Sequence, residues 1–431
     1  MPPANSIRIE ELVNYFNYDY PHPHDHEGAF EVCYEVSDCP WNPRNRLVHI
    51  GIQGKEIDMD DAPEGNFVFL VDVSGSMDDP DKLPLLKKGL KLMVNELDEH
   101  DTVAMVTYAG YQSLALPATS GSNKGTILKA IDDLGAGGGT AGADGIRMAY
   151  DIALKNFIDN GNNRIILATD GDFNIGISKD EELIKLIEEK RKSGVFISTL
   201  GFGTGNLKDS KLEKIANHGN GNYSYIDTIL EAQKVLVDEM GGTMITIAKD
   251  VKLQVEFNPA MVDSYRLIGY ENRVLATEDF HDDTKDAGEL GSGHTVTALY
   301  EIVPATKDLE NDGKLSLRYQ TRDISDLALN DRELLILKMR YKEPNGDTSS
   351  LIEMPLEDDS VRLQDTTDDY RFSAAVALFG MLLRQSEYTG NGDYDMVLEL
   401  ARNSLSVDEF GYRAEFIELV EEAMLLSEAV K

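Results

Sequence analysis

The chain has little cysteine and no long apolar run. Only two of its 431 residues are cysteines, Cys33 and Cys39, so a fold held together by many disulfides is excluded. The two could form one short bridge in an oxidising compartment or remain free thiols, and the sequence leaves both open. No stretch approaches the roughly 20 apolar residues that a membrane-spanning helix needs. We therefore expect no transmembrane segment in this chain.

Positive charge is also scarce. Lys and Arg together number 41 against 77 Asp and Glu, which gives a net charge of −36. A field of this sign repels nucleic acid and anionic lipid, so we expect neither as a main partner. Apolar residues make up 42% of the chain, enough for buried cores. The length predicts two or three domains.

The stretch FVFLVDVSGSM, residues 67–77, is the most informative part of the sequence. Its first five residues are apolar without alternation, which is typical of a strand buried on both faces of a parallel sheet. Polar residues then follow at every second position: Asp72, Ser74 and Ser76. Ligands of open α/β sheets bind at the carboxyl ends of the strands. A carboxylate and two hydroxyls at such an end suit Mg²⁺ or Mn²⁺ better than zinc.

Two later stretches carry polar residues in a related way. RIILATDGD, residues 164–172, predicts a second buried strand that ends at the carboxylate of Asp170. GGGTAGAD, residues 137–144, is a glycine-rich loop that carries Thr140 just before a predicted helix. The order of D-x-S-x-S, a threonine in a glycine-rich loop and a strand followed by T-D-G resembles the metal-ion-dependent adhesion site (MIDAS) of von Willebrand factor type A (VWA) domains. The match covers all five ligand positions.

The resemblance implies a Mg²⁺ site, with Mn²⁺ or Ca²⁺ as alternative ions, at Asp72, Ser74, Ser76, Thr140 and Asp170. In VWA domains the hydroxyls bind the ion directly, and the two aspartates act largely through water. An Asp or Glu of a partner protein fills the open coordination position. The rim that this partner contacts is expected to include Gly75, Met77, Gly139 and Asp172.

The patterns along the chain predict an α/β protein with several parts. These are an N-terminal helix and strands (1–62), a doubly wound, Rossmann-like VWA domain (63–248), a β-sandwich (249–358) and a C-terminal helical region (359–431). The N-terminal strands, 30–36 and 47–52, cannot bury a face alone. We therefore expect them to pair with the sandwich, which would make the VWA domain an insertion.

Several local features have competing interpretations. The loop at 22–26 contains three histidines and could bind a transition metal, but a solvated turn is favoured. The acidic segment Glu278–Glu289 could bind Ca²⁺, but it lacks EF-hand spacing and favours a solvated loop. Gly201–Gly205 lacks the third glycine of a dinucleotide loop. Alternation along 30–36 predicts that Cys33 lies on the polar face of its strand with Glu31 and Glu35, and Thr389–Gly392 is expected to separate two C-terminal helices.

Segments outside the VWA-like part resemble the block that follows the VWA domain in a family of bacterial envelope proteins. They are residues 258–260, 266–273, 286–288, 297–301 and 411–416. Members of that family are typically exported, often as lipoproteins, and their C-terminal region has no established activity. The resemblance implies a periplasmic or cell-surface location. It also implies that this chain starts inside the family's N-terminal region, without the signal or lipid-attachment cysteine.

We expect a protein-binding module for adhesion or scaffolding rather than an enzyme. The alternative is a metal-dependent hydrolase or phosphatase with Asp72 as the nucleophile. The sequence places no general base near Asp72, and the loop lacks the second Asp or the Lys that phosphoryl transfer would need. A third hypothesis is a VWA partner of a ring ATPase. The resemblance to exported proteins and the predicted sandwich argue against it.

Overall fold

The chain divides into two compact units. The computed structural model describes residues 3–23, 28–57, 62–137, 142–171, 180–204, 208–238, 245–270, 277–283, 287–305, 324–325, 328–329, 332–344, 346, 348–408 and 410–429. Unit 1 comprises Met1–Lys55, Ala248–Ala287 and His294–Lys431. Unit 2 comprises Glu56–Ile247 and Gly288–Gly293. Within the described ranges, no helix has both the length and the apolar character that crossing a membrane requires.

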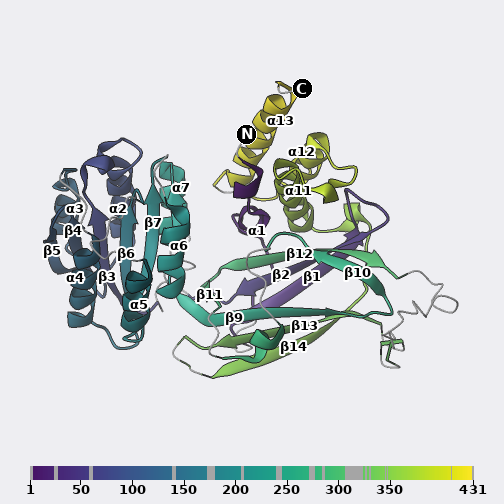
Figure 1. Ribbon diagram of the computed structural model, residues 1–431, viewed down its shortest axis with the longest axis horizontal. Coiled ribbons are helices and arrows are strands. Elements are labelled where there is room, and N and C mark those ends of the chain that lie inside the picture. The colour runs from purple at the N-terminus through teal and green to yellow at the C-terminus, as the bar shows by residue number, and fades with distance from the viewer. Residues whose placement is uncertain are drawn as a thin grey trace. The chain divides into compact units, whose positions relative to one another are not determined.

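Unit 2 has the doubly wound architecture that the alternating pattern predicted. Its described strands form a six-stranded sheet in the order β5-β4-β3-β6-β7-β8, parallel except for β5 at one edge. The strands are β3 (Gly65–Asp72), β4 (Thr102–Tyr108), β5 (Gln112–Ser120), β6 (Asn162–Thr169), β7 (Phe196–Phe202) and β8 (Tyr223–Ile226). Figure 1 shows this sheet between helices.

The helices of unit 2 cover both faces of the sheet. They are η3 (Gly75–Asp78), α2 (Leu83–Glu96), α3 (Lys124–Asp132), α4 (Gly142–Lys155), α5 (Asp180–Arg191), α6 (Asp209–His218), α7 (Ile229–Gln233) and the π-helix η4 (Lys234–Asp238). A short strand, β11 (Gly288–Gly291), also belongs to this unit, and the N–H of Ser292 after it donates to the carbonyl of Ile245 at 2.8 Å.

Strand β3 lies at the centre of unit 2 and is buried along its whole length. Phe69 and Val71 pack with the apolar residues of α2, α3 and α7 on one face. Val68 and Leu70 pack with those of α4 and α5 on the other face. Neighbours β4 and β6 are both parallel to β3, so the three carboxyl ends meet at one edge of the sheet. This edge is where the candidate metal ligands lie.

Unit 1 contains a β-sandwich built from strands that are far apart in the sequence. One sheet has the order β1 (Phe30–Asp38), β2 (Arg46–Gly54), β12 (Thr295–Pro304) and β10 (Val262–Leu267). The facing sheet contains β9 (Thr246–Phe257), β13 (Glu333–Lys342) and β14 (Ser349–Glu357). The expected pairing of the N-terminal strands with the later ones is present, because β2 and β12 pair antiparallel with Ile50 opposite Ala298.

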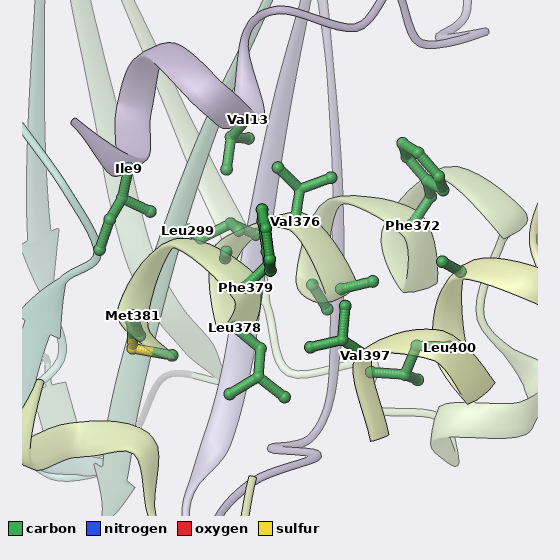
Figure 2. Packing of buried hydrophobic residues seen from close by; sticks show 14 of the residues in the cluster. Ile9, Val13, Leu299, Phe372, Val376, Leu378, Phe379, Met381, Val397 and Leu400 are labelled. Atoms are coloured by element: carbon green, nitrogen blue, oxygen red, sulfur yellow. The ribbon is translucent and has the colours of Figure 1, made fainter. Parts of the chain in front are cut away.

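Helices cover the outer face of the first sheet. The helices on this face are α1 (Ile9–Val13), α11 (Asp368–Leu383), α12 (Tyr394–Arg402) and α13 (Tyr412–Ala429), which contribute to the main buried cluster. The short helices of unit 1 are η1 (Ala4–Ser6), η5 (Thr277–His281), η6 (Leu363–Asp365) and η7 (Glu387–Thr389). Of these, η5 lies against the other sheet, where the carbonyl of Asp279 accepts from Lys252 of β9. Figure 2 shows α1, α11 and α12 meeting there with Leu299 of β12. The prediction of two C-terminal helices missed α12. Asp393 caps this helix by accepting from the N–H of Met396 at 2.9 Å, and Val397 and Ala401 are buried.

The predicted polar face for Cys33 is wrong. Cys33 lies opposite Gly51 of β2 and packs beside the helical cluster, because the helices cover that face of the sheet. The structure has both cysteines as free thiols, with Cys33 partly buried and Cys39 buried. Burial raises the pKa of each thiol to about 12.

The acidic segment Glu278–Glu289 is attached to the sandwich by cations. The carboxylate of Asp283 forms an ion pair with Arg340 at 2.8 Å, and Lys252 donates to the carbonyl of Asp282 at 2.5 Å. They hold the described part of the segment on the sandwich, with His281 and Asp283 exposed to solvent. Residues 24–26 of the histidine loop and residues 306–323 of the predicted sandwich lie outside the described residues.

Candidate metal centre

Asp72, the last residue of β3, is fixed in a buried hydrogen-bond network. Its Oδ1 accepts from the N–H of Ser74 at 2.9 Å. Its Oδ2 accepts from the hydroxyl of Thr169 at 2.9 Å and from that of Tyr108 at 3.2 Å. Burial raises the pKa of Asp72 above its ordinary value, and the bonds from Ser74 and Thr169 oppose this rise. Both oxygens are therefore already held by protein donors.

The two serines place their hydroxyls side by side just beyond Asp72. Ser74 Oγ and Ser76 Oγ are 3.0 Å apart. Ser74 is buried and Ser76 is partly exposed. The chain turns into η3 at Gly75, which brings these alternate residues to the same side. The hydroxyls form a compact pair of hard oxygen donors.

Asp170 enters the same region from the neighbouring strand. It follows β6 directly, and its residue is 1% exposed. Its charge is one of the causes that raise the pKa of Asp72, so the two carboxylates interact. The backbone after it is tied back, since the N–H of Gly171 donates to the Thr169 hydroxyl at 3.2 Å. The two strand-end motifs that the sequence singled out therefore meet.

Three of the predicted residues, Thr140, Gly139 and Asp172, lie outside the described part of the chain. The glycine-rich loop nevertheless begins beside the site, because the N–H of Gly137 donates to the carbonyl of Val73 at 2.7 Å. Among the predicted rim residues, Gly75 is exposed. Met77 is fully buried in the core of unit 2, which corrects its assignment to the rim. The turn of η3 directs its side chain inward against the apolar face of the sheet.

Sequence reasoning missed Lys82, which reaches into this site from the residue before α2. Its Nζ donates to the carbonyl of Ser76 at 2.9 Å and to Asp170 Oδ2 at 3.2 Å. The exposed carboxylate of Asp79 also lies near this group, with 3.4 Å between Lys82 Nζ and Asp79 Oδ2. Burial lowers the pKa of Lys82, but the bonds to Asp170 and Asp79 outweigh it and raise the pKa. The signal in the sequence was a lysine where a helix N-cap usually has Ser, Thr, Asp or Asn.

The residues present fit a small divalent cation. Two serine hydroxyls and two carboxylates offer oxygen donors, which Mg²⁺ prefers over nitrogen or sulfur. Among the described residues, no group of three or more His, Cys, Asp or Glu side chains is arranged to hold a metal ion, so the serine hydroxyls are needed as ligands here. Because the ammonium group of Lys82 offsets one of the two carboxylates, such a site would leave a bound dication incompletely neutralised and able to accept a further anionic ligand.

Comparisons with known proteins agree with this architecture. Residues 66–239 match the family described as von Willebrand factor type A domain, and residues 242–426 match the one described as Uncharacterized protein YfbK, C-terminal. Residues 1–49 match a third family, described as von Willebrand factor. Proteins of the VWA kind are typically non-catalytic interaction modules.

Individual relatives extend the comparison. The chain is 44% identical to Uncharacterized protein YfbK of Escherichia coli (strain K12) over 427 residues, which is 98% of this chain and 73% of that protein. It is 29% identical to Uncharacterized protein sll0103 of Synechocystis sp. over 187 residues, 43% of each chain. Among solved structures, a von Willebrand factor type A protein from Catenulispora acidiphila aligns with 93% of this chain and 91% of its own, at 15% identity and a TM-score of 0.47. The chain belongs to the YfbK family, and it joins a VWA domain to a YfbK C-terminal domain.

Proposed function

We propose that this protein is a metal-ion-dependent protein-binding module. In this proposal Ser74, Ser76 and Thr140 bind Mg²⁺ through their hydroxyls, and Asp72 and Asp170 act largely through water. The observation that carries the proposal is the pair of serine hydroxyls 3.0 Å apart at the strand edge where two buried carboxylates interact. Asp72 already accepts three hydrogen bonds, which suits a residue that orients the loop and bound water rather than one that binds the ion directly.

The partner is expected to supply an Asp or Glu to the open coordination position. The net charge of −36 repels an acidic partner at long range, but exposed charges are screened beyond about 8 Å at physiological salt. The ion acts at bonding distance, where this screening does not reach. We therefore expect the acidic residue to lie in neutral or basic surroundings on the partner.

Metal titration of the full chain tests the site. Asp170→Asn removes a buried charge at the site, and Asp78→Asn is the matched control because Asp78 is an exposed carboxylate in the adjacent η3. Isothermal titration with Mn²⁺ should give one site in the wild type and in Asp78→Asn, and none in Asp170→Asn. Equal affinity in all three chains would contradict the proposal.

One observation favours a second function, a metal-dependent phosphatase. Lys82 supplies the lysine that the sequence did not place near Asp72, and it contacts Asp170. The same geometry argues against Asp72 as a nucleophile, because both of its oxygens are held by protein donors and the residue itself is fully buried. We expect no hydrolysis of p-nitrophenyl phosphate in Mg²⁺. Activity that disappears in Asp72→Asn would favour the phosphatase.

We infer further that the protein acts at the bacterial cell envelope. The support for this is the resemblance of the segments after the VWA domain to exported envelope proteins. Fractionation of cells that express the protein at its natural level should find it in the periplasmic or membrane fraction. Capture from envelope extract with and without EDTA would then identify a metal-dependent partner, and capture unaffected by EDTA would argue that another surface binds it.

A further inference from the structure

Lys82 occupies a position that local rules disfavour. It is the N-cap of α2, where a side-chain oxygen normally accepts from the first free N–H groups, and its side chain makes no cap bond. A cation at this end also opposes the helix dipole. Positions that break such rules without a local benefit are often functional. For Lys82 the compensating interactions are those of the ammonium group at the end of its side chain.

The side chain of Lys82 is a buried part of the site. Its side chain is 10% exposed, and its Nζ joins the D-x-S-x-S loop to Asp170 through the two bonds described above. Gly203 makes room for this side chain, since a Cβ there would lie 2.3 Å from Lys82 Cε. Gly203 also has φ +77°, where other residues are strained. The ammonium group is therefore held in place rather than resting on the surface.

The charge of Lys82 changes what the site prefers to bind. The two buried carboxylates, Asp72 and Asp170, carry −2, and Lys82 reduces this buried charge to −1. The carboxylate of Asp79 also lies near Lys82, but its side chain is 69% exposed, so solvent screens its charge. A bound dication then leaves the site at +1, whereas without Lys82 it would leave the site neutral. Burial makes these interactions stronger than they would be in water. With Lys82 present, the metal alone is held less tightly, and a partner's carboxylate restores neutrality.

We propose that Lys82 is a resident cation of the metal site, which weakens binding of the metal alone and couples tight metal binding to an acidic partner. This rests on the proposed function of the same site. The inference adds a residue, Lys82, that controls how tightly the site binds the metal ion before a partner is present. Without metal, Lys82 keeps Asp170 neutralised, so the unloaded protein does not carry two unpaired buried carboxylates.

Titration of the full chain with Mn²⁺ alone tests this proposal. Lys82→Met keeps the length of the side chain and removes its charge, and Lys82→Gln is a second neutral variant. Lys88→Met is the matched control, because Lys88 is an exposed lysine of the same helix. We expect the dissociation constant for Mn²⁺ to fall by about tenfold or more in both Lys82 variants and to stay within about twofold in Lys88→Met.

Thermal melting supplies a second readout. In EDTA the Lys82 variants should melt below the wild type, because Asp170 has lost its ammonium partner, and Mn²⁺ should raise their melting temperature more than that of the wild type. If Mn²⁺ binding depends on Asp170 but is unchanged or weaker in both Lys82 variants, or if saturating Mn²⁺ does not restore them, the inference is wrong while the metal site stands. If no chain binds Mn²⁺, the proposed function itself fails, and the inference with it.

Discussion

Thr169 connects the two halves of the candidate site with a single hydroxyl. It donates to Asp72 and accepts from the N–H of Gly171, and the residue is fully buried. One side chain thus orients the carboxylate at the end of β3 and the turn that presents Asp170. This linkage is a property of the residue rather than of the strand, since valine would suit the strand equally well.

Thr169→Val should therefore destabilise the protein by about 1–3 kcal/mol, because a buried carboxylate and a buried N–H each lose a partner. Scanning calorimetry of the full chain measures the effect. Thr119→Val is the control, since the Thr119 hydroxyl bonds only locally to the carbonyl of Pro117 on an edge strand. We expect the control to change stability by less than about 0.5 kcal/mol. Equal melting of Thr169→Val and wild type would contradict this role.

His49 is a second buried polar residue, on β2 in unit 1. Its Nε2 lies 2.9 Å from the hydroxyl of Tyr20, which also contacts Thr297 Oγ1 at 2.7 Å. Burial lowers the pKa of His49 to about 3. The folded protein therefore keeps this ring neutral across the range in which an unfolded chain, with a pKa of about 6.5, takes up a proton.

Stability should fall as the pH decreases from about 6.5 towards 3, because the unfolded state binds the additional proton. The loss attributable to His49 is about 2 kcal/mol between pH 7 and pH 5. Chemical unfolding at several pH values measures it. His49→Gln should flatten the dependence, whereas His100→Gln, at an exposed histidine, should not. A profile that is equally steep in His49→Gln would show that other groups cause it.

At the scale of the element, β2 is buried on both faces although it is part of a sandwich. Leu47 and His49 face the helices, and Val48 and Ile50 face the second sheet. Gly51, on the helical side, leaves space for the ring of Tyr20 and for Cys33. A Cβ at this position would lie 2.7 Å from Tyr20 and 2.8 Å from the Cys33 sulfur.

Gly51→Ala should destabilise unit 1 by about 1–3 kcal/mol through overpacking. Gly125→Ala is the control, since Gly125 lies in α3 with no atom within 4 Å of the added Cβ. That change should be neutral or stabilising by up to about 1 kcal/mol. Thermal melting of the two variants gives the comparison. An unchanged melting temperature for Gly51→Ala would mean that Tyr20 moves aside at little cost.

At the scale of the whole molecule, unit 2 interrupts unit 1 in the sequence. Because β2 lies between β1 and β12, a chain that lacks residues 1–55 loses two strands of the first sheet and the helix α1. The apolar residues of β12 that β2 covers would then be exposed. Residues 56–247 keep all six strands of the unit 2 sheet.

We therefore expect residues 56–247 to fold alone, and residues 249–431 to aggregate when expressed without residues 1–55. Co-expression of a fragment spanning residues 1–55 is the control and should recover soluble protein. Solubility and the cooperativity of thermal unfolding are the measurements. A soluble, cooperatively folding 249–431 fragment would show that the N-terminal strands are dispensable for folding of this unit.

The amino-acid sequence by itself determined what local patterns encode. Three patterns could be recognised without coordinates: the unbroken apolar run of β3, the alternation of strand and helix, and the polar residues after two buried strands. These polar residues are Asp72, Ser74, Ser76 and Asp170. The three patterns identified the doubly wound sheet and brought four candidate ligands to one edge, because parallel strands end together. The resemblance to VWA domains follows from the same motifs.

Only the tertiary structure decided which side chains meet across distant parts of the chain. Lys82 contacts Asp170, which is 88 residues away in the sequence. Met77 is fully buried in the core, although it lies in the same loop as the candidate ligands. Cys33 has strand alternation typical of a solvent-facing position, yet helices from the far end of the sequence cover it. In each case the environment comes from contacts remote in sequence, and periodicity carries no information about those.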